Sequence, residues 1–391
     1  MKMVRQVASG RTVCHGLQQD LGAERLDSSK TRSLFRNVPE CAEFIRGSPL
    51  NECGLDTHWR VREDTGLRFL LFVLETVVRA VVFDGQLHFT RDAVLRTIQP
   101  GEVAVDILQA GICETDMQLC QGYMGFRGIP GHEFVGIPRT GRFAGQRVVG
   151  EINCSCESCA TCRGGGRNHC PTRTVVGIVN HDGAFAETVL IPERNLLPVP
   201  DSISTSVAVF TEPLAAACRI PQQISMNGQK VTVLGDGRLG NLSAQVLRHH
   251  GCQVQVVGKH PAKLDLLNSL GISTRLLSDL EPDRESDIVV DCTGSPTGLS
   301  TALQLVRPCG TIVLKTTVAS SQTLHMAPFV IDEITLLGSR CGPFDEALRL
   351  LQVGAIQVAP LLSASYPLEE AEQAFAHAAR RDALKVLFTI Q

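Results

Sequence analysis

Five cysteines lie close together between Cys154 and Cys170, in the sequence Cys-Ser-Cys-Glu-Ser-Cys-Ala-Thr-Cys-Arg-Gly-Gly-Gly-Arg-Asn-His-Cys. Thiolates that bind one tetrahedral metal ion must converge on a single point. The spacing allows one lobe of chain to wrap four thiolates around such a point, and leaves Cys154 spare. The candidate ligands of this closed site are Cys156, Cys159, Cys162 and Cys170.

The other cysteines of the chain are scattered singly, which is typical of a protein kept in a reducing compartment and argues against disulfides. The chain of 391 residues is long enough for two domains, each with its own core. Its 37 basic and 40 acidic residues give a net charge of -3, so it offers no basic field to nucleic acid or an anionic membrane. The apolar run over residues 69–74 is far shorter than the roughly 20 residues that span a bilayer. We therefore expect a cytoplasmic protein with a small-molecule partner, without nucleic-acid or membrane binding.

Residues 1–77 show weak apolar periodicity and no motif, and the first clear strand pattern begins at Val78. We interpret residues 1–77 as an extension that is disordered or that precedes the native start of translation. A regulatory or partner-binding arm is the alternative. The intact mass of the natively expressed protein distinguishes the two.

The remaining chain changes its pattern near Ser204. Before it, short apolar runs separated by Gly and Pro predict a compact, barrel-like β domain. After it, the pattern predicts helices over 207–217 and 239–250, alternating with strands over 231–234, 254–257, 287–291 and 310–314. Such alternation over residues 212–342 is typical of a doubly wound parallel sheet. An amphipathic helix over 368–380 and a strand over 386–390 follow.

A glycine-rich turn, Gly235-Asp-Gly-Arg-Leu-Gly240, follows the first of these strands and opens a helix. In this context Gly235 permits a tight turn, Gly237 lets the backbone approach a pyrophosphate, and Gly240 allows helix and strand to pack closely. The helix N-terminus then offers amide groups to the phosphates. The motif predicts a dinucleotide cofactor.

The second strand of such a fold usually ends in an acidic residue that binds the adenosine ribose of NAD. Here Gly258 takes that place, and three basic residues follow, namely Lys259, His260 and Lys263. A ribose 2'-phosphate would be attracted by these residues, so the sequence favours NADP over NAD. The alternative is that they form only a solvated basic turn.

A second candidate metal site combines residues from three stretches. Cys113 lies in Gly111-Ile-Cys-Glu-Thr-Asp116, and His132 with Glu133 lies in Gly131-His-Glu-Phe. Glu212 lies just before the nucleotide-binding pattern. Together they could form a three-ligand site with an open position, which catalytic zinc requires.

From about Val78 to Gln391, the chain carries these motifs in one order, together with Asp182-Gly-Ala-Phe-Ala-Glu187 and a closing Lys385-Val-Leu. In this it resembles the zinc-dependent medium-chain dehydrogenases of the alcohol, polyol and threonine dehydrogenase group. The resemblance implies an α/β protein with a GroES-like β-barrel catalytic domain, residues 78–211 and 343–391. It also implies a Rossmann NAD(P)-binding domain, residues 212–342.

The resemblance implies two zinc ions per chain. Cys113 and His132 match the catalytic zinc ligands, Glu133 matches a carboxylate that can exchange onto the metal, and the four-cysteine lobe matches a structural zinc site. Glu212 stands where alcohol dehydrogenases have a cysteine and polyol dehydrogenases a glutamate. The zinc would polarise a substrate hydroxyl, and a hydride would pass from the substrate to the nicotinamide.

Further roles follow from the same match. Asp116 would orient the ligating histidine, and Thr115 would pass the substrate proton toward the cofactor ribose. Two positions depart from the family. Many relatives have a titratable histidine where this chain has Gln118, and a basic or small residue where it has Glu114. Arg340 is a candidate contact to cofactor or substrate.

We therefore expect an oxidoreductase that acts on a secondary alcohol, such as a polyol, sugar or amino alcohol, as a homodimer or homotetramer. Within enzymes, the alternative is an NADPH-dependent aldehyde or ketone reductase. A non-catalytic relative that only binds cofactor is a further possibility. From another class, the lobe could be a zinc ribbon of a nucleic-acid-binding protein, which the acidic charge balance disfavours.

Overall fold

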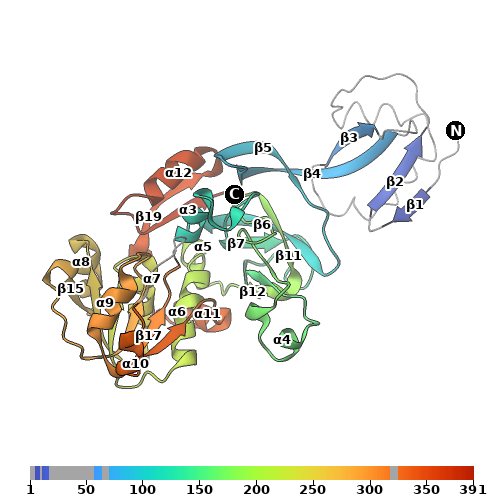
Figure 1. The fold of residues 1–391 in the computed structure, drawn as a ribbon. Helices are drawn as coiled ribbons and strands as arrows, with labels where there is room; N and C mark the ends of the chain where they lie inside the picture. The colour runs from blue at the N-terminus through green and yellow to red at the C-terminus, as the bar shows by residue number, and fades with distance from the viewer. Residues whose placement is uncertain (1–4, 9–10, 17–56, 64–69, 318–324) are drawn as a thin grey trace. The chain divides into compact units, whose positions relative to one another are not determined.

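The computed structural model describes residues 5–8, 11–16, 57–63, 70–317 and 325–391 (Figure 1). The chain divides into two compact units, one comprising Met1–Ala80 and Thr90–Pro100, the other Val81–Phe89 and Gly101–Gln391. One sheet has the strand order β1-β2-β4-β3, with β5 paired to β4, and the last residues of β4 and the first residues of β5 belong to the second unit. The bounds of these strands are β1 Arg5–Ala8, β2 Arg11–Gly16, β3 Thr57–Glu63, β4 Leu70–Phe83 and β5 Leu87–Leu95. The predicted extension, residues 1–77, lies largely outside the described residues, and β4 begins before Val78.

A seven-stranded sheet forms the β domain of the second unit. Its order is β12-β8-β7-β6-β20-β19, with β11 also paired to β6, and its pairs are antiparallel except for β19 with β20. The bounds are β6 Glu102–Gly111, β7 Glu133–Pro138, β8 Val148–Gly150, β11 Thr188–Pro192, β12 Leu196–Pro198, β19 Leu362–Pro367 and β20 Lys385–Thr389. The C-terminal strand therefore completes the sheet that the earlier strands begin.

Short elements connect the strands of this sheet. They include the segments that contain Cys113 and the four-cysteine lobe. The small ribbon of β9 and β10 lies beside the four-cysteine lobe. The elements are α3 Glu114–Cys120, η2 Tyr123–Gly125, β9 Asn153–Cys154, α4 Ala160–Arg163, η3 Arg167–His169, β10 Thr174–Val175, η4 Glu193–Asn195, η7 Leu368–Glu370 and α12 Ala371–Ala378.

A second sheet is parallel and six-stranded, in the order β15-β14-β13-β16-β17-β18. This order reverses direction at β13, as in a doubly wound sheet. Its strands are β13 Lys230–Leu234, β14 Gln253–Gly258, β15 Ser273–Leu276, β16 Ser286–Asp291, β17 Val306–Leu314 and β18 Thr335–Gly338. Its helices are α7 Arg238–His249, α8 Pro261–Ser269, η5 Leu277–Asp279, α9 Gly298–Leu305 and α10 Ala327–Ile331. The predicted fold class is confirmed.

Apolar side chains alternate between the two faces of this parallel sheet. Val256 and Val290 belong to one buried cluster, whereas their neighbours Val257 and Val289 belong to another. Because successive strand residues point to opposite faces, continuous apolar runs are needed where both faces are covered. This explains why these strands were visible in the sequence.

The helix predicted over 207–217 is instead two helices, α5 Thr205–Ala208 and α6 Thr211–Gln223. Pro213 has no N–H to donate to the Val209 carbonyl, so the hydrogen-bond ladder is interrupted there. Proline is tolerated in the first turn of the new helix. The break places Glu212 at the start of α6.

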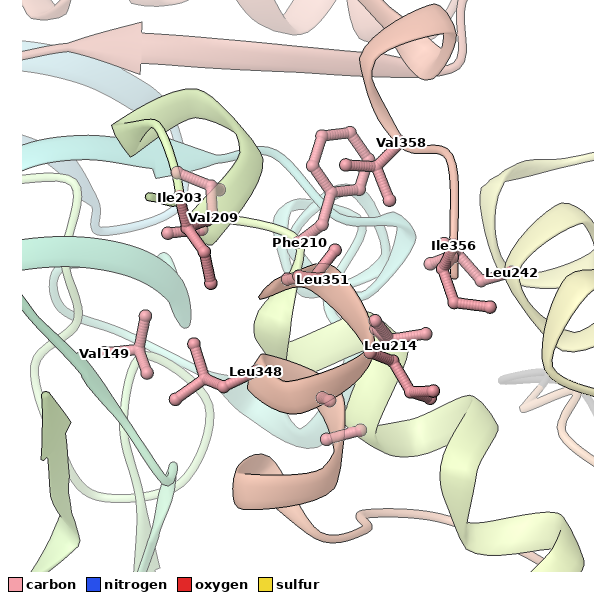
Figure 2. Close-up of a cluster of buried hydrophobic side chains, with 14 of the residues drawn as sticks. Val149, Ile203, Val209, Phe210, Leu214, Leu242, Leu348, Leu351, Ile356 and Val358 are labelled. Atoms are coloured by element: carbon pink, nitrogen blue, oxygen red, sulfur yellow. The ribbon is translucent and has the colours of Figure 1, made fainter. Parts of the chain in front are cut away.

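A buried apolar cluster joins strands of the seven-stranded sheet to several helices, among them α7 of the parallel-sheet domain (Figure 2). It contains Val149 of β8, Leu214 of α6, Leu242 of α7 and Leu348 of α11 Phe344–Gln352, together with Val358 before η6 Ala359–Leu361. Such shared burial holds α6 and α11 against both domains. Within the described residues, the structure contains no helix long and apolar enough to span a membrane.

Candidate active site

Three potential metal ligands converge at the end of the seven-stranded sheet. Donor atoms of Cys113, His132 and Glu133 all lie within 4.8 Å of one another. Cys113 is the N-cap residue of α3, His132 directly precedes β7, and Glu133 is the first residue of β7. His132 and Glu133 are buried, whereas Cys113 is partly exposed.

Asp116 positions two of these ligands from the first turn of α3. Its fully buried carboxylate accepts hydrogen bonds from the backbone N–H of Cys113 at 2.8 Å and of Gly131 at 3.2 Å. The same carboxylate lies 3.2 Å from His132 Nδ1, close enough for an ionic contact although the two atoms do not meet hydrogen-bond geometry. A carboxylate on one ring nitrogen fixes the orientation of a histidine and leaves Nε2 for a metal. Burial opposes the imidazolium, yet Asp116 and Cys113 together raise the pKa of His132 well above its usual value.

Glu133 forms a buried ion pair with Lys385 of β20. Gly111 of β6 lies opposite Glu133 in the sheet, and a Cβ there would lie 2.7 Å from Glu133 Oε2 and 3.3 Å from Lys385 Cδ. Only glycine leaves room for this pair. Lys385 occupies one carboxylate oxygen, while Oε1 is buried without a hydrogen-bond partner in the described structure.

These residues fit a zinc ion. Zinc binds sulfur, nitrogen and carboxylate oxygen in a tetrahedral arrangement, and a catalytic site has three protein ligands and one open position. The orphaned Glu133 Oε1 is a buried acceptor that a cation would satisfy. The donor set therefore suits a catalytic zinc.

Glu212 lies outside the set of converging donor atoms. Burial raises the pKa of its carboxyl group to about 7; Glu133 adds to the shift, whereas His132 and Lys385 oppose it. The pKa of Glu212, at the start of α6, therefore depends on the charges of His132, Glu133 and Lys385.

Two other predicted positions lie on α3. The Thr115 hydroxyl lies 3.9 Å from Cys113 Sγ, beside the site. Gln118 donates a hydrogen bond to the Glu114 carboxylate at 3.1 Å, so the two departures from the family pattern engage each other.

The four-cysteine lobe brings Cys156, Cys159, Cys162 and Cys170 within 4.8 Å of one another. Cys156 Sγ lies 3.6 Å from Cys170 Sγ and 4.0 Å from Cys162 Sγ, and no disulfide joins them. Hydrogen bonds from Ser158 lower the pKa of the Cys156 thiol to about 5, which favours the thiolate that metals bind. Four sulfur donors without an open position fit a structural zinc.

The glycine turn has the geometry that the sequence predicts. Gly235 has a φ of +113°, in the region that favours glycine. A Cβ on Gly240 would lie 2.0 Å from the Gly235 carbonyl oxygen, so helix α7 packs directly on the turn. A Cβ on Gly237 would meet open space, which leaves its backbone accessible to a ligand.

Asp236, inside the glycine motif, was missed by sequence reasoning. Its buried carboxylate accepts hydrogen bonds from the backbone N–H groups of Lys259 and His260, both at 2.7 Å, and lies 3.0 Å from His260 Nδ1. A Cβ on Gly258 would lie 2.5 Å from this carboxylate. The end of β14 thus lacks an acid of its own because Asp236 occupies the space.

The three basic residues after β14 differ in their surroundings. Lys259 is exposed, and His260 pairs with Asp236. Lys263 donates to the Ala383 carbonyl at 2.9 Å, and burial lowers its pKa. Similarly, Arg238 donates to the Leu384 carbonyl at 2.6 Å. Lys263 therefore holds the C-terminal segment rather than facing open solvent.

The sequence matches known families and proteins. The family model of the alcohol dehydrogenase GroES-like domain matches residues 99–201, and that of the zinc-binding dehydrogenase matches residues 239–353. The L-threonine 3-dehydrogenase of Streptomyces avermitilis is 30% identical over 317 residues, 74% of this chain and 92% of the relative. The 2-dehydro-3-deoxy-L-galactonate 5-dehydrogenase of Pseudoalteromonas atlantica is 28% identical over 304 residues, 71% of this chain and 88% of the relative.

A solved structure has a similar fold. A zinc-binding dehydrogenase of Sinorhizobium meliloti bound to NADP superposes with a TM-score of 0.73 at 26% identity, covering 80% of this chain and 99% of that one. The resemblance seen in the sequence is thus confirmed in domain composition and fold. The chain belongs to the zinc-dependent medium-chain dehydrogenase/reductase family, whose members are oxidoreductases that use zinc and a nicotinamide cofactor.

Proposed function

We propose that the chain oxidises a secondary alcohol of a small polar molecule with NAD(P), at a catalytic zinc held by Cys113, His132 and Glu133. The observation that carries this proposal is the convergence of these three donors beside an orphaned carboxylate oxygen. Glu212 serves the same site as a carboxylate that can approach the metal. The threonine and sugar-acid dehydrogenases among its relatives support the substrate class.

When bound, the zinc acts as a Lewis acid on the substrate oxygen. Asp116 holds His132 in its ligating orientation, and Lys385 offsets the charge of Glu133. Thr115 accepts the hydroxyl proton at its Oγ1 and passes it toward the cofactor. Gln118 cannot titrate, so the proton leaves α3 through water.

Several finer assignments belong to the same proposal. The four-cysteine lobe holds a second, structural zinc, supported by the convergence of its sulfur atoms. NADP is favoured over NAD, supported by exposed Lys259 and by the NADP-bound relative. The catalytic domain comprises 78–211 and 343–391 and the cofactor domain 212–342. We further propose a cytoplasmic homodimer or homotetramer.

The test combines metal content with turnover. Elemental analysis of the zinc-loaded chain should give two zinc ions, with one lost in His132→Ala, one lost in Cys159→Ser and both lost when the two changes are combined. A panel of polyols, sugar acids and amino alcohols, assayed by nicotinamide absorbance with both cofactors, should give turnover that His132→Ala abolishes. His181→Ala is the matched control, because this buried histidine binds the Asp182 carbonyl instead.

Other outcomes identify the alternatives. Carbonyl reduction with NADPH in the absence of alcohol oxidation would indicate a reductase. Cofactor binding with one zinc and no turnover in either direction would contradict the proposal and indicate a non-catalytic relative.

A further inference from the structure

Arg340 lies in the segment between β18 and α11, and its guanidinium group reaches the four-cysteine lobe. Nη2 donates to the Asn168 carbonyl at 2.6 Å and to Asn153 Oδ1 at 2.9 Å. Asn168 belongs to η3, inside the loop that Cys162 and Cys170 close. The segment that follows the parallel sheet is thereby hydrogen-bonded to the proposed structural zinc lobe.

The backbone of the same segment is fixed on helix α6. Lys315 Nζ donates to the Arg340 carbonyl at 3.0 Å and to the Ala216 carbonyl of α6 at 2.6 Å. A Cβ on Gly342 would lie 1.9 Å from the Ala215 carbonyl oxygen, so the two backbones are in direct contact. The helix thus fixed carries Glu212 in its first turn.

Asn153 of β9 extends the link to Glu151. Its side chain is buried and bonds both Arg340 and the Glu151 carboxylate. The acceptors of Arg340 are a carbonyl and an amide oxygen, so the contact is a pair of charge-assisted hydrogen bonds and not an ion pair. Loss of the guanidinium would leave the buried Asn153 oxygen without this donor.

We propose that Arg340 is a positioning residue that couples the metal state of the four-cysteine lobe to the placement of α6 and the cofactor domain. This rests on the proposed function only for the identity of the lobe metal. Four thiolates sharing one ion hold Asn168 in place, and Arg340 transmits that order to the segment packed on α6. Without metal, Asn168 loses its anchor and the segment is released.

The first experiment measures metal release and needs no turnover. In the His132→Ala background only the lobe binds zinc, and its transfer to a chromophoric chelator reports lobe stability. Arg340→Met should speed this release roughly tenfold, and Arg340→Lys, which retains a charged donor on a shorter side chain, should lie between it and the parent. Arg349→Met is the control, because Arg349 is exposed and pairs with Glu346 within α11. Unchanged release in Arg340→Met overturns the proposal.

The second experiment is a double-mutant cycle on the otherwise intact chain. Arg340→Met and Cys159→Ser should each weaken binding of NADPH or NADH, measured by nicotinamide fluorescence, and raise KM more than they lower kcat. In the double variant the effect should not exceed that of Cys159→Ser alone, since interacting residues are not additive. Multiplied effects would refute the coupling. A chain that shows the non-additivity but turns over no alcohol would contradict the proposed function and leave the coupling standing.

Discussion

The Lys385 ammonium group and the Glu133 carboxylate form an ion pair in which the two residues are 0% and 1% exposed. The pair bridges β20 and β7 across Gly111 of β6. It therefore ties the last strand of the sheet to a proposed zinc ligand.

Replacing Lys385 by methionine leaves the Glu133 charge buried and uncompensated. We expect the zinc-free variant to lose about 3–5 kcal/mol of unfolding free energy, measured by urea denaturation. Lys230→Met provides the control, because its pair with Glu285 is exposed and such pairs contribute ~1 kcal/mol or less. Equal losses in the two variants would show that burial of the pair does not matter.

Asp116→Asn should weaken zinc binding at the catalytic site by about 10–100-fold, because His132 loses the carboxylate that orients its ring. Competition with a chromophoric chelator measures the affinity. Asp106→Asn is a suitable comparison, since Asp106 pairs with Arg139 instead. An unchanged zinc affinity in Asp116→Asn would show that Asp116 does not contribute to zinc binding.

The sequence indicated both groups of converging donor residues, apart from the place given to Glu212, and the parallel sheet, because these signals are local. Cys113, His132 and the four cysteines lie in motifs, and the parallel strands are continuous apolar runs. Asp236 and Lys385 could not be assigned in the same way, because their partners come from distant segments that only the fold brings together. The sequence showed that Gly258 stands where an acidic residue is usual. Only the structure shows that the Asp236 side chain occupies the space beside Gly258.

Lys259→Ala should weaken NADPH binding roughly tenfold and leave NADH binding nearly unchanged. The reason is that only NADPH carries the 2'-phosphate, whose charge the Lys259 ammonium group would attract. Fluorescence titration with both cofactors measures it. In Lys263→Ala we expect the two affinities to change in parallel, since Lys263 Nζ holds the Ala383 carbonyl. An equal change for both cofactors in Lys259→Ala would contradict the NADP preference.

Gly342→Ala should destabilise the chain by about 1–3 kcal/mol, because a methyl group cannot fit against the Ala215 carbonyl without moving α6 or its neighbour. Gly338→Ala is matched to it, because a Cβ at that position meets no atom within 4 Å. Thermal denaturation of both variants measures the difference. Similar melting temperatures would show that the segment adapts freely.

Asp287 links three strands of the parallel sheet through the Lys230 backbone and the Arg307 side chain. The Arg307 hydrogen bond and then that from Lys230 lower the pKa of the Asp287 carboxyl. A lowered folded-state pKa stabilises the fold above the unfolded value near 4, and that contribution is lost as pH falls through the folded value. Asp287→Asn should therefore cost about 1 kcal/mol at pH 7 and progressively less in acid. A cost independent of pH would exclude the charge as its cause.

The seven-stranded sheet is completed late in synthesis, because β20 pairs with β6 and β19 pairs with β20. Every strand of the cofactor domain leaves the ribosome before Lys385 does. Domains generally fold in the order in which they emerge. Until Lys385 arrives, Glu133 has no counter-charge, so a nascent chain should acquire its dinucleotide fold before its metal chemistry.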